Sequence, residues 1–286
     1  MNAHSEVTIY PGTASWEAAR HARRRKYRYL ISAAHHTTWL LGKSFPSLFP
    51  LVFVLGYPKS GTSWSCQLVA ECLRLPFPQH SILPIGCAAV VHGHEALTPL
   101  YPRAVYVMRD GRDALVSMYF HQQLNNAERS VSRAELGASA TLKREITHFV
   151  RDQLRKPTAS RLNWAAHVRT YLDNREAAAL LRYEDLLTDG PATLGAAIRQ
   201  LTREHPDDSR IQQAIEKFSF ARQTGRASGI EDRASYLRKG QAGDWLNYFT
   251  LEAAEVFAAE CGDTLIRAGY ETDDSWVSKV ATCVPV

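Results

Sequence analysis

The chain has 286 residues, of which 45% are hydrophobic and 22% are charged, proportions typical of a globular protein with a full core. Its formal net charge of +5 suits an anionic small molecule. No zinc-ligand spacing, ribonucleoprotein signature or aromatic–basic repeat accompanies that charge, so we expect no nucleic-acid partner. No apolar run approaches the roughly 20 residues of a membrane-spanning helix, so we also expect no integral membrane segment.

The cysteines and the N-terminus indicate a cytoplasmic location. The five cysteines are odd in number and include no Cys-x-x-Cys pair, which is typical of reduced thiols. The first residues lack the positive and then apolar pattern of a secretory signal. We therefore expect a cytoplasmic protein.

The N-terminal region predicts a helix over residues 13–42. It contains the densest basic run of the chain, from Arg23 to Arg28. Such a run most often forms a solvated helix face, and contact with an acceptor, a membrane surface or nucleic acid remains an alternative. We expect residues 1–48 to form a helical extension that precedes the first strand.

A buried strand followed by a glycine loop dominates the next segment. Residues 51–55 are continuously apolar, as in a strand that is covered on both faces. Gly56 and Gly61 bracket the loop, and Thr62 or Ser63 can cap the helix that follows. A strand, a glycine loop and a helix N-terminus together form a binding site for a phosphate-like anion.

The position of the lysine in this loop decides which anion site it is. The spacing from Gly56 to Gly61 matches the first half of a Walker A loop, but Thr62 occupies the position of the Walker lysine and Lys59 lies inside the loop. A P-loop nucleotide kinase remains an alternative, because Ala104 to Asp110 is similar to a Walker B strand. A plain surface turn with a solvated lysine is the other alternative.

Strands and helices alternate along the rest of the chain. This alternation predicts an α/β fold with a central parallel sheet flanked by helices, in which ligands bind beyond the carboxyl ends of the strands. We expect strands at 88–91, 104–108 and 178–183, helices at 111–124, 141–155, 160–174, 190–203, 207–217 and 250–268, loops at 76–88 and 125–140, and a Gly/Ser-rich stretch at 219–243.

Three segments resemble the motifs of sulfotransferases that use 3′-phosphoadenosine 5′-phosphosulfate (PAPS). They are the 5′-phosphosulfate loop at 57–64, the 3′-phosphate segment at 106–117 and the Arg-Lys-Gly signature at 238–250. The resemblance implies a single sulfotransferase domain over 1–286 with a P-loop-like fold and its catalytic core at 49–270. It also implies PAPS as donor, adenosine 3′,5′-bisphosphate (PAP) as product, no metal and a small-molecule acceptor. The Ala/Arg-rich composition favours a bacterial source, and a homodimer remains an alternative.

The resemblance assigns a role to each matching residue. Lys59 would meet the bridging oxygen and the 5′-phosphate, with help from Ser60, Gly61, Thr62 and Ser63. The 3′-phosphate would be held by Arg109, Ser117, Arg238, Lys239 and Gly240. The adenine would contact Trp64, Tyr183, Ser219 and Phe220. Two plainer interpretations stay open: Trp64 as a core residue, and an ion pair of Arg109 with Asp110 or Asp113.

The general base implied by the resemblance is a histidine before the 3′-phosphate strand. His92 aligns best with it, and His94 is the second candidate. A neutral histidine can accept the proton of an attacking hydroxyl. The lysine that the family has two residues earlier is replaced by Val90, which motivates a non-catalytic nucleotide-binding protein as another alternative. Glu184 or Asp185 could also act as a base, although acids after a strand more often cap a helix.

The acceptor pocket is expected in the segments 76–101 and 119–124. Their apolar and aromatic residues predict a hydrophobic wall and hence a hydrophobic or aromatic acceptor with a hydroxyl group. These residues are Phe77, Leu83, Leu97, Leu100, Tyr101, Tyr119 and Phe120.

Overall fold

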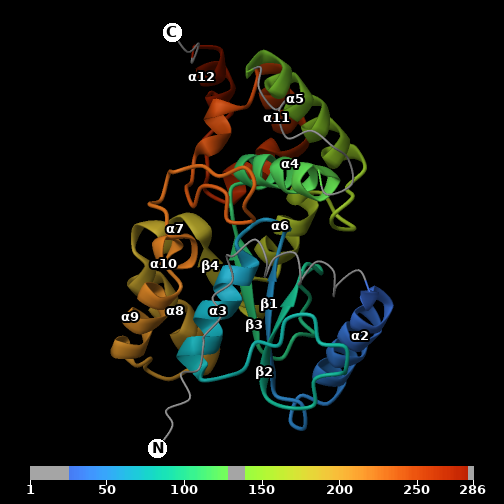
Figure 1. Ribbon diagram of the computed structural model, residues 1–286, viewed down its shortest axis with the longest axis vertical. Coiled ribbons are helices and arrows are strands. Elements are labelled where there is room, and N and C mark those ends of the chain that lie inside the picture. Colours follow the sequence, from blue (N-terminus) through green and yellow to red (C-terminus); the bar gives the residue numbers. More distant parts are fainter. Residues whose placement is uncertain (1–25, 128–138, 283–286) are drawn as a thin grey trace, which may run out of the picture.

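A computed structural model describes residues 26–127 and 139–282 of the chain (Figure 1). Most of the predicted loop at 125–140, the first part of the basic run and Cys283 lie outside these residues. The described cysteines, which are Cys66, Cys72, Cys87 and Cys261, are free thiols. Among the described helices, none has the length and apolar character needed to cross a bilayer.

The centre of the fold is a four-stranded parallel sheet with the strand order β2-β1-β3-β4. The strands are β1 (Leu51–Gly56), β2 (Ala89–Gly93), β3 (Ala104–Met108) and β4 (Ala179–Arg182). Every residue of β1 and β3 is buried, which explains why their sequences are continuously apolar. The prediction of a parallel α/β sheet is confirmed.

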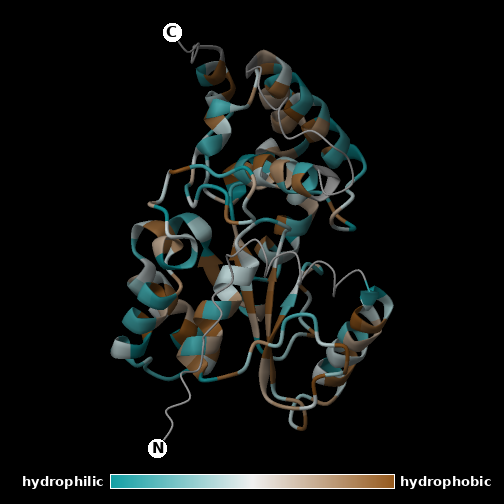
Figure 2. Cartoon of the chain, in the orientation of Figure 1, coloured by the Kyte–Doolittle hydropathy of each residue, from teal (hydrophilic) through white to brown (hydrophobic). Residues whose placement is uncertain are grey.

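The two faces of the sheet contribute to separate halves of the core. Alternate side chains of a strand point to opposite faces, so Leu51, Phe53 and Leu55 of β1 pack in one cluster, and Val52 and Val54 pack in the other. Figure 2 shows this pattern as hydrophobic strands between helices that carry hydrophilic residues on their outer sides.

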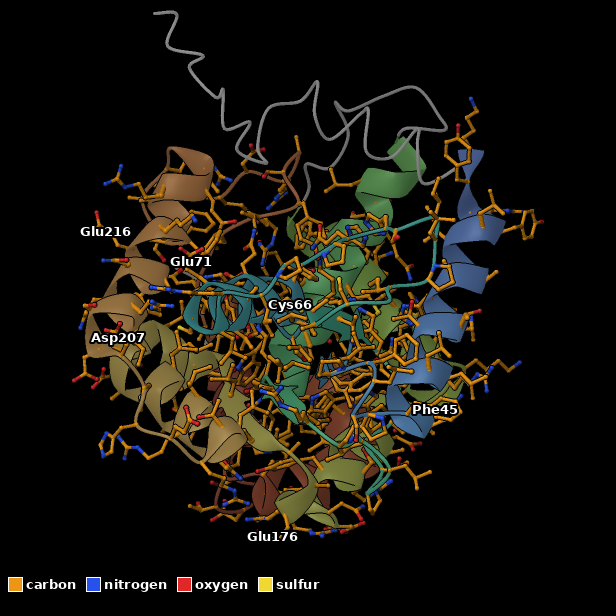
Figure 3. All side chains as sticks on the ribbon, turned by 90° about the horizontal axis from the view of Figure 1, so that it is seen from below. Phe45, Cys66, Glu71, Glu176, Asp207 and Glu216 are labelled. Atoms are coloured by element: carbon orange, nitrogen blue, oxygen red, sulfur yellow. The ribbon has the colours of Figure 1, made fainter. Side chains whose placement is uncertain are left out.

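Different sets of helices cover the two clusters. Helices α3 (Thr62–Leu73), α8 (Gly190–Thr202) and α9 (Asp208–Lys217) pack on the face of Val52. The face of Phe53 is covered by α4 (Gly111–Ala127), α5 (Ser139–Arg155), α6 (Trp164–Leu172), α11 (Leu251–Arg267) and α12 (Trp276–Thr282). Figure 3 shows Cys66 of α3 among side chains near the centre of the molecule, whereas Asp207 and Glu216 lie at its rim.

Helix α2 (Arg28–Ser44) lies on the opposite side of the sheet from α8 and α9 (Figure 1). Its Trp39 packs against Phe53 of β1, with ring centres 5.0 Å apart. The shorter elements of the chain are η1 (Arg175–Ala177), α7 (Tyr183–Thr188), α10 (Phe220–Thr224) and η2 (Asp244–Asn247).

Two strands end at other residues than predicted. Strand β2 continues to Gly93, so that His92 pairs with Val54 inside the sheet. Strand β4 ends at Arg182, and Tyr183 begins α7. Both differences arise from pairing with neighbouring strands, which a local apolar pattern does not report.

Candidate functional site

The glycine loop lies between the carboxyl end of β1 and the first turn of α3. A side chain at Gly56 would place its Cβ 2.6 Å from the carbonyl oxygen of Val107 in the neighbouring strand. Gly61 has a φ of 87°, and its Cβ would lie 2.7 Å from Cδ2 of Tyr183. The loop can therefore take this path only with glycine at both positions, as expected of a close-fitting anion site.

Lys59 has an unusual backbone conformation and is half-buried. Its φ of 69° lies in the left-handed region, which non-glycine residues seldom adopt and which is enriched at functional sites. Its ammonium nitrogen lies 3.8 Å from the centre of the Tyr236 ring. Burial lowers the pKa of this lysine.

Several polar atoms around the loop have no hydrogen-bond partner among the described residues. They are the hydroxyl oxygens of Ser60 and Thr62, Nε1 of Trp64 and Nε of Arg109, all buried. The N-cap residue of α3 is Gly61, so no side chain caps the start of this helix. Buried polar atoms are normally paired, so unpaired donors from residues around a helix N-terminus fit an anionic ligand.

Arg109 connects three segments at the end of β3. It donates hydrogen bonds to the carbonyl oxygens of Lys59 at 3.0 Å and Gln241 at 3.2 Å. Its guanidinium carbon lies 4.2 Å from the centre of the Tyr183 ring. An ion pair with Asp113 is present at 3.9 Å, whereas Asp110 pairs with Arg112 instead.

The Arg-Lys-Gly segment is held beside this arginine by Asp113. The Asp113 carboxylate accepts hydrogen bonds from the backbone N–H groups of Gly243 at 2.7 Å and Trp245 at 2.9 Å. The side chains of Arg238 and Lys239 both contact Asp244, and Arg238 also contacts Glu231. The segment that carries the predicted second half of the phosphate clamp is thus fixed next to the first half.

The remaining predicted nucleotide contacts surround the same region. The rings of Trp64 and Tyr183 lie 5.9 Å apart at 75°. Gly240 packs against Phe220, because a Cβ at Gly240 would lie 2.4 Å from the Phe220 ring. Ser219 accepts a hydrogen bond from the backbone of Arg222 and so caps α10. Ser117 is half-buried in the second turn of α4.

A cavity of about 770 Å³ adjoins the lysine loop. Its walls come from the loop at 58–63, the inner side of α2, the segment 77–85, the end of β2 and α4. Both Lys59 and the pair His92 and His94 line it. The cavity therefore joins the expected sulfuryl position to the two candidate bases.

The two histidines at the end of β2 lie side by side. Their rings are nearly perpendicular, with centres 4.5 Å apart. Nδ1 of His94 lies 2.8 Å from the carbonyl oxygen of Gly56. A carbonyl can only accept, so Nδ1 of His94 carries the proton and the lone pair of the neutral ring is on Nε2.

Residues that the sequence interpretation missed also line the cavity. His35, His80 and His121 bring the number of histidines in the lining to five, and Tyr236 covers Lys59. Helix α2 approaches closely because Gly93 has no side chain: a Cβ there would lie 2.3 Å from Trp39. The sequence contains one local indication that Tyr236 belongs to the site, which is its position two residues before Arg238 of the Arg-Lys-Gly motif. In the described part of the chain, no group of three or more His, Cys, Asp or Glu side chains is arranged to hold a metal ion.

Two of the seven residues predicted for the acceptor wall line this cavity. Phe77 and Leu83 line the cavity. Leu100 is instead 72% exposed, and the other four residues are buried in the core: Leu97, Tyr101, Tyr119 and Phe120. Tyr101, for example, packs between Trp39 and Phe53, with ring centres 5.3 and 5.1 Å away.

This arrangement defines an α/β protein with a strand–loop–helix anion site, and comparison with known proteins gives the family. Residues 90–269 match the model of the sulfotransferase domain, so the chain belongs to the sulfotransferase family. The 3-alpha-hydroxysteroid sulfotransferase of Cavia porcellus is 27% identical over 239 residues, 70% of this chain and 78% of that protein. Sulfotransferase 2A2 of Mus musculus is 27% identical over 248 residues, 72% and 81% of the two chains.

Solved structures agree with this fold. Retinol dehydratase in complex with androsterone and the inactive cofactor PAP aligns with a TM-score of 0.54 and 19% identity, over 75% of this chain and 80% of that one. Mouse sulfotransferase SULT7A1 complexed with PAP aligns with a TM-score of 0.53 and 20% identity. The alignment covers 82% of this chain and 89% of that one. The protein is a PAPS-dependent sulfotransferase, and the kinase and non-catalytic alternatives are not retained.

Proposed function

We propose that this enzyme transfers a sulfuryl group from PAPS to a hydroxyl of a small acceptor that binds in the cavity beside Lys59. The observation that carries the proposal is the cavity itself, which places the lysine loop and the histidines of β2 along one continuous space. When bound, PAPS supplies the sulfuryl group and a phosphate leaving group. The protein supplies positioning, positive charge and a proton acceptor.

The donor would be held at both of its phosphate ends. The buried hydroxyls of Ser60 and Thr62 and the start of α3 fit the 5′ end, with Ser63 on the cavity side. Arg109, with the adjoining segment from Arg238 to Gly240, fits the 3′ end, because guanidinium groups form strong forked hydrogen bonds with phosphate. Ser117 of α4 belongs to this end by its position in the sequence motif.

The adenine would lie against aromatic side chains between these two ends. Tyr183 packs under the Arg109 guanidinium and beside Trp64. Phe220 packs on Gly240, next to the helix that Ser219 caps. Flat rings at these positions suit the face of a purine.

The geometry favours His94 as the general base, with His92 beside it. Gly56 fixes the ring of His94 so that its lone pair is on Nε2, the atom that would take the acceptor proton. The backbone of His94 is also fixed, since its carbonyl accepts a hydrogen bond from the buried His167 at 3.1 Å. The sequence-based choice of His92 stays a prediction that the same experiment tests.

The acceptor would be an amphiphilic molecule with a hydrophobic or aromatic body. Apolar side chains of the lining include Ile31, Phe77, Ile85 and Met118, whereas the histidines and Glu95 provide polar contacts. The volume of the cavity lies in the range of sites that bind drug-sized ligands. Two relatives are named for hydroxysteroids, and a structural neighbour is complexed with androsterone, which supports a compact lipophilic alcohol or phenol.

Residues 49–270 are our proposed catalytic core. Helix α2 precedes this core and also contributes to the pocket, because residues from Arg28 to Thr38 form one wall of the cavity. The acceptor pocket therefore depends on the N-terminal helix.

The test is transfer of labelled sulfate from PAPS to a panel of phenols, steroid alcohols and primary alcohols. We expect His94→Ala to lower kcat about 10²- to 10⁴-fold, the usual effect of losing a general base, with PAP affinity unchanged in calorimetry. His92→Ala should lower kcat less. The reverse order would return the base to His92, and full activity in both variants would contradict a histidine base.

A further inference from the structure

Tyr236 makes a direct contact with the lysine of the phosphate loop. The Lys59 ammonium lies 3.8 Å from the centre of its ring, within the range of a cation–π interaction. Tyr236 is 37% exposed and lines the cavity. It therefore lies where the lysine, the donor and the acceptor would meet.

The loop that carries Tyr236 is tied together by one arginine. The Arg226 guanidinium donates hydrogen bonds to the carbonyl oxygens of Ile230 at 2.6 Å, Leu237 at 2.6 Å and Arg238 at 2.9 Å. The Tyr236 ring also lies edge-on to His121 of α4, with centres 5.4 Å apart. The ring thus contacts helix α4, and the loop that carries it is held by Arg226.

We propose that Tyr236 is a positioning residue that holds the Lys59 ammonium at the 5′ end of the donor site. A lysine side chain has four rotatable methylene groups and loses substantial entropy when it is fixed, so an aromatic partner lowers the number of positions it samples. This inference rests on the proposed function, because it assumes that Lys59 meets the phosphosulfate end of the nucleotide.

The surroundings of Lys59 lower its pKa, and a partner that raises the pKa keeps the ammonium charged. Burial lowers the pKa of Lys59, and the nearby cations Arg109 and Arg238 lower it further. The Tyr236 hydroxyl acts in the opposite direction and raises the pKa of Lys59. The tyrosine hydroxyl therefore helps Lys59 to remain charged in a crowded cationic site.

A purely structural role is the competing explanation. Tyr236 is two residues from Arg238, so its loss could simply disturb the loop that carries the 3′-phosphate clamp. Two half-ligands separate the two roles: adenosine 5′-monophosphate reports the Lys59 end, and adenosine 3′-monophosphate reports the end at Arg109 and Arg238.

The experiment is calorimetry of both monophosphates and of PAP with Tyr236→Leu, Tyr236→Phe and, as a matched control, Tyr29→Leu on α2, where the tyrosine is 74% exposed. Tyr236→Leu should weaken the 5′-monophosphate about tenfold, the effect of losing one partly desolvated cation–π contact, and leave the 3′-monophosphate within about twofold of wild type. Tyr236→Phe should restore part of the affinity because it keeps the ring. The control should bind all three ligands as wild type does.

The pH profile of PAP binding gives a second measurement that does not need the leucine variant to fold. Loss of the hydroxyl in Tyr236→Phe should move the alkaline decrease of PAP affinity to lower pH, since Lys59 then deprotonates earlier. Equal losses for the two monophosphates, or an alkaline limb that does not move, would overturn the positioning role. If the wild-type protein binds neither PAP nor the monophosphates, the proposed function itself fails.

Discussion

Replacing Gly61 by alanine should damage both the stability of the fold and the nucleotide site. Gly61 has a φ of 87°, a conformation that costs an L-residue about 1–2 kcal/mol. The new Cβ would also lie 2.7 Å from Tyr183, whose ring is confined by Arg109 above it and Trp64 at its edge. Overpacking of a confined site adds about 1–3 kcal/mol, so we expect a total destabilisation of about 2–5 kcal/mol.

Gly225→Ala is the matched control for this change. Gly225 has a φ of 71°, but no atom lies within 4 Å of the position that a Cβ would take there, so the substitution tests backbone conformation without the contact. The loss of unfolded-chain entropy is the same for both variants and cancels in the comparison. The free energy of unfolding measured in urea should therefore be about 1–3 kcal/mol lower for Gly61→Ala than for Gly225→Ala.

Calorimetry with PAP completes the comparison. Gly61→Ala should weaken PAP binding because it displaces Tyr183 and the first turn of α3, whereas Gly225→Ala should bind PAP normally. If the two variants have the same free energy of unfolding and the same PAP affinity, the close contact between the loop and Tyr183 is not what requires glycine.

Two further predictions concern buried groups that support the site. Asp113→Asn should weaken PAP binding about tenfold or more. The reason is that hydrogen bonds from the backbone N–H groups of Gly243 and Trp245 to a charged acceptor contribute about 1.5–3 kcal/mol. Unchanged PAP affinity in calorimetry would contradict this anchoring role. Burial lowers the pKa of His167 to about 4, so the unfolded chain binds a proton that the folded chain does not between about pH 6.5 and 4. Stability should therefore fall by about 3 kcal/mol as the pH falls through this window, and urea titrations of His167→Gln should show a shallower fall; an equal slope in both proteins would contradict it.

The parts of the fold that could be predicted from the sequence are those that local pattern determines. Strands β1 and β3 are buried on both faces, so their continuous apolar runs identify them without knowledge of their neighbours. Thr250 caps α11 by accepting a hydrogen bond from the backbone of Ala253, and helices α4 and α11 both start within one residue of their predicted positions. The end of β2 depends on pairing with β1, and it was therefore placed two residues too early.

The nucleotide end of the site was easier to predict than the acceptor end. Lys59, Arg109 and the segment at 238–240 lie in short motifs at the ends of strands or next to them, and the structure brings them together. The cavity is built from segments as distant as α2 and Tyr236, and their side chains meet only through tertiary packing. Tyr101 and Phe120 were predicted to line the acceptor pocket because they are aromatic residues of the expected segments, but both pack in the hydrophobic core instead.

A crystal structure with PAP bound is the most direct test of the central claim, which is that one nucleotide is held at both phosphate ends beside the histidine-lined cavity. We predict that the 5′-phosphate lies within hydrogen-bond distance of Lys59 and the start of α3, and that the 3′-phosphate contacts Arg109 and Arg238. The cavity lined by His92 and His94 should then open onto the 5′ end. A nucleotide bound in the reverse direction, or one that leaves Lys59 or Arg109 without contact, would contradict the proposed mechanism.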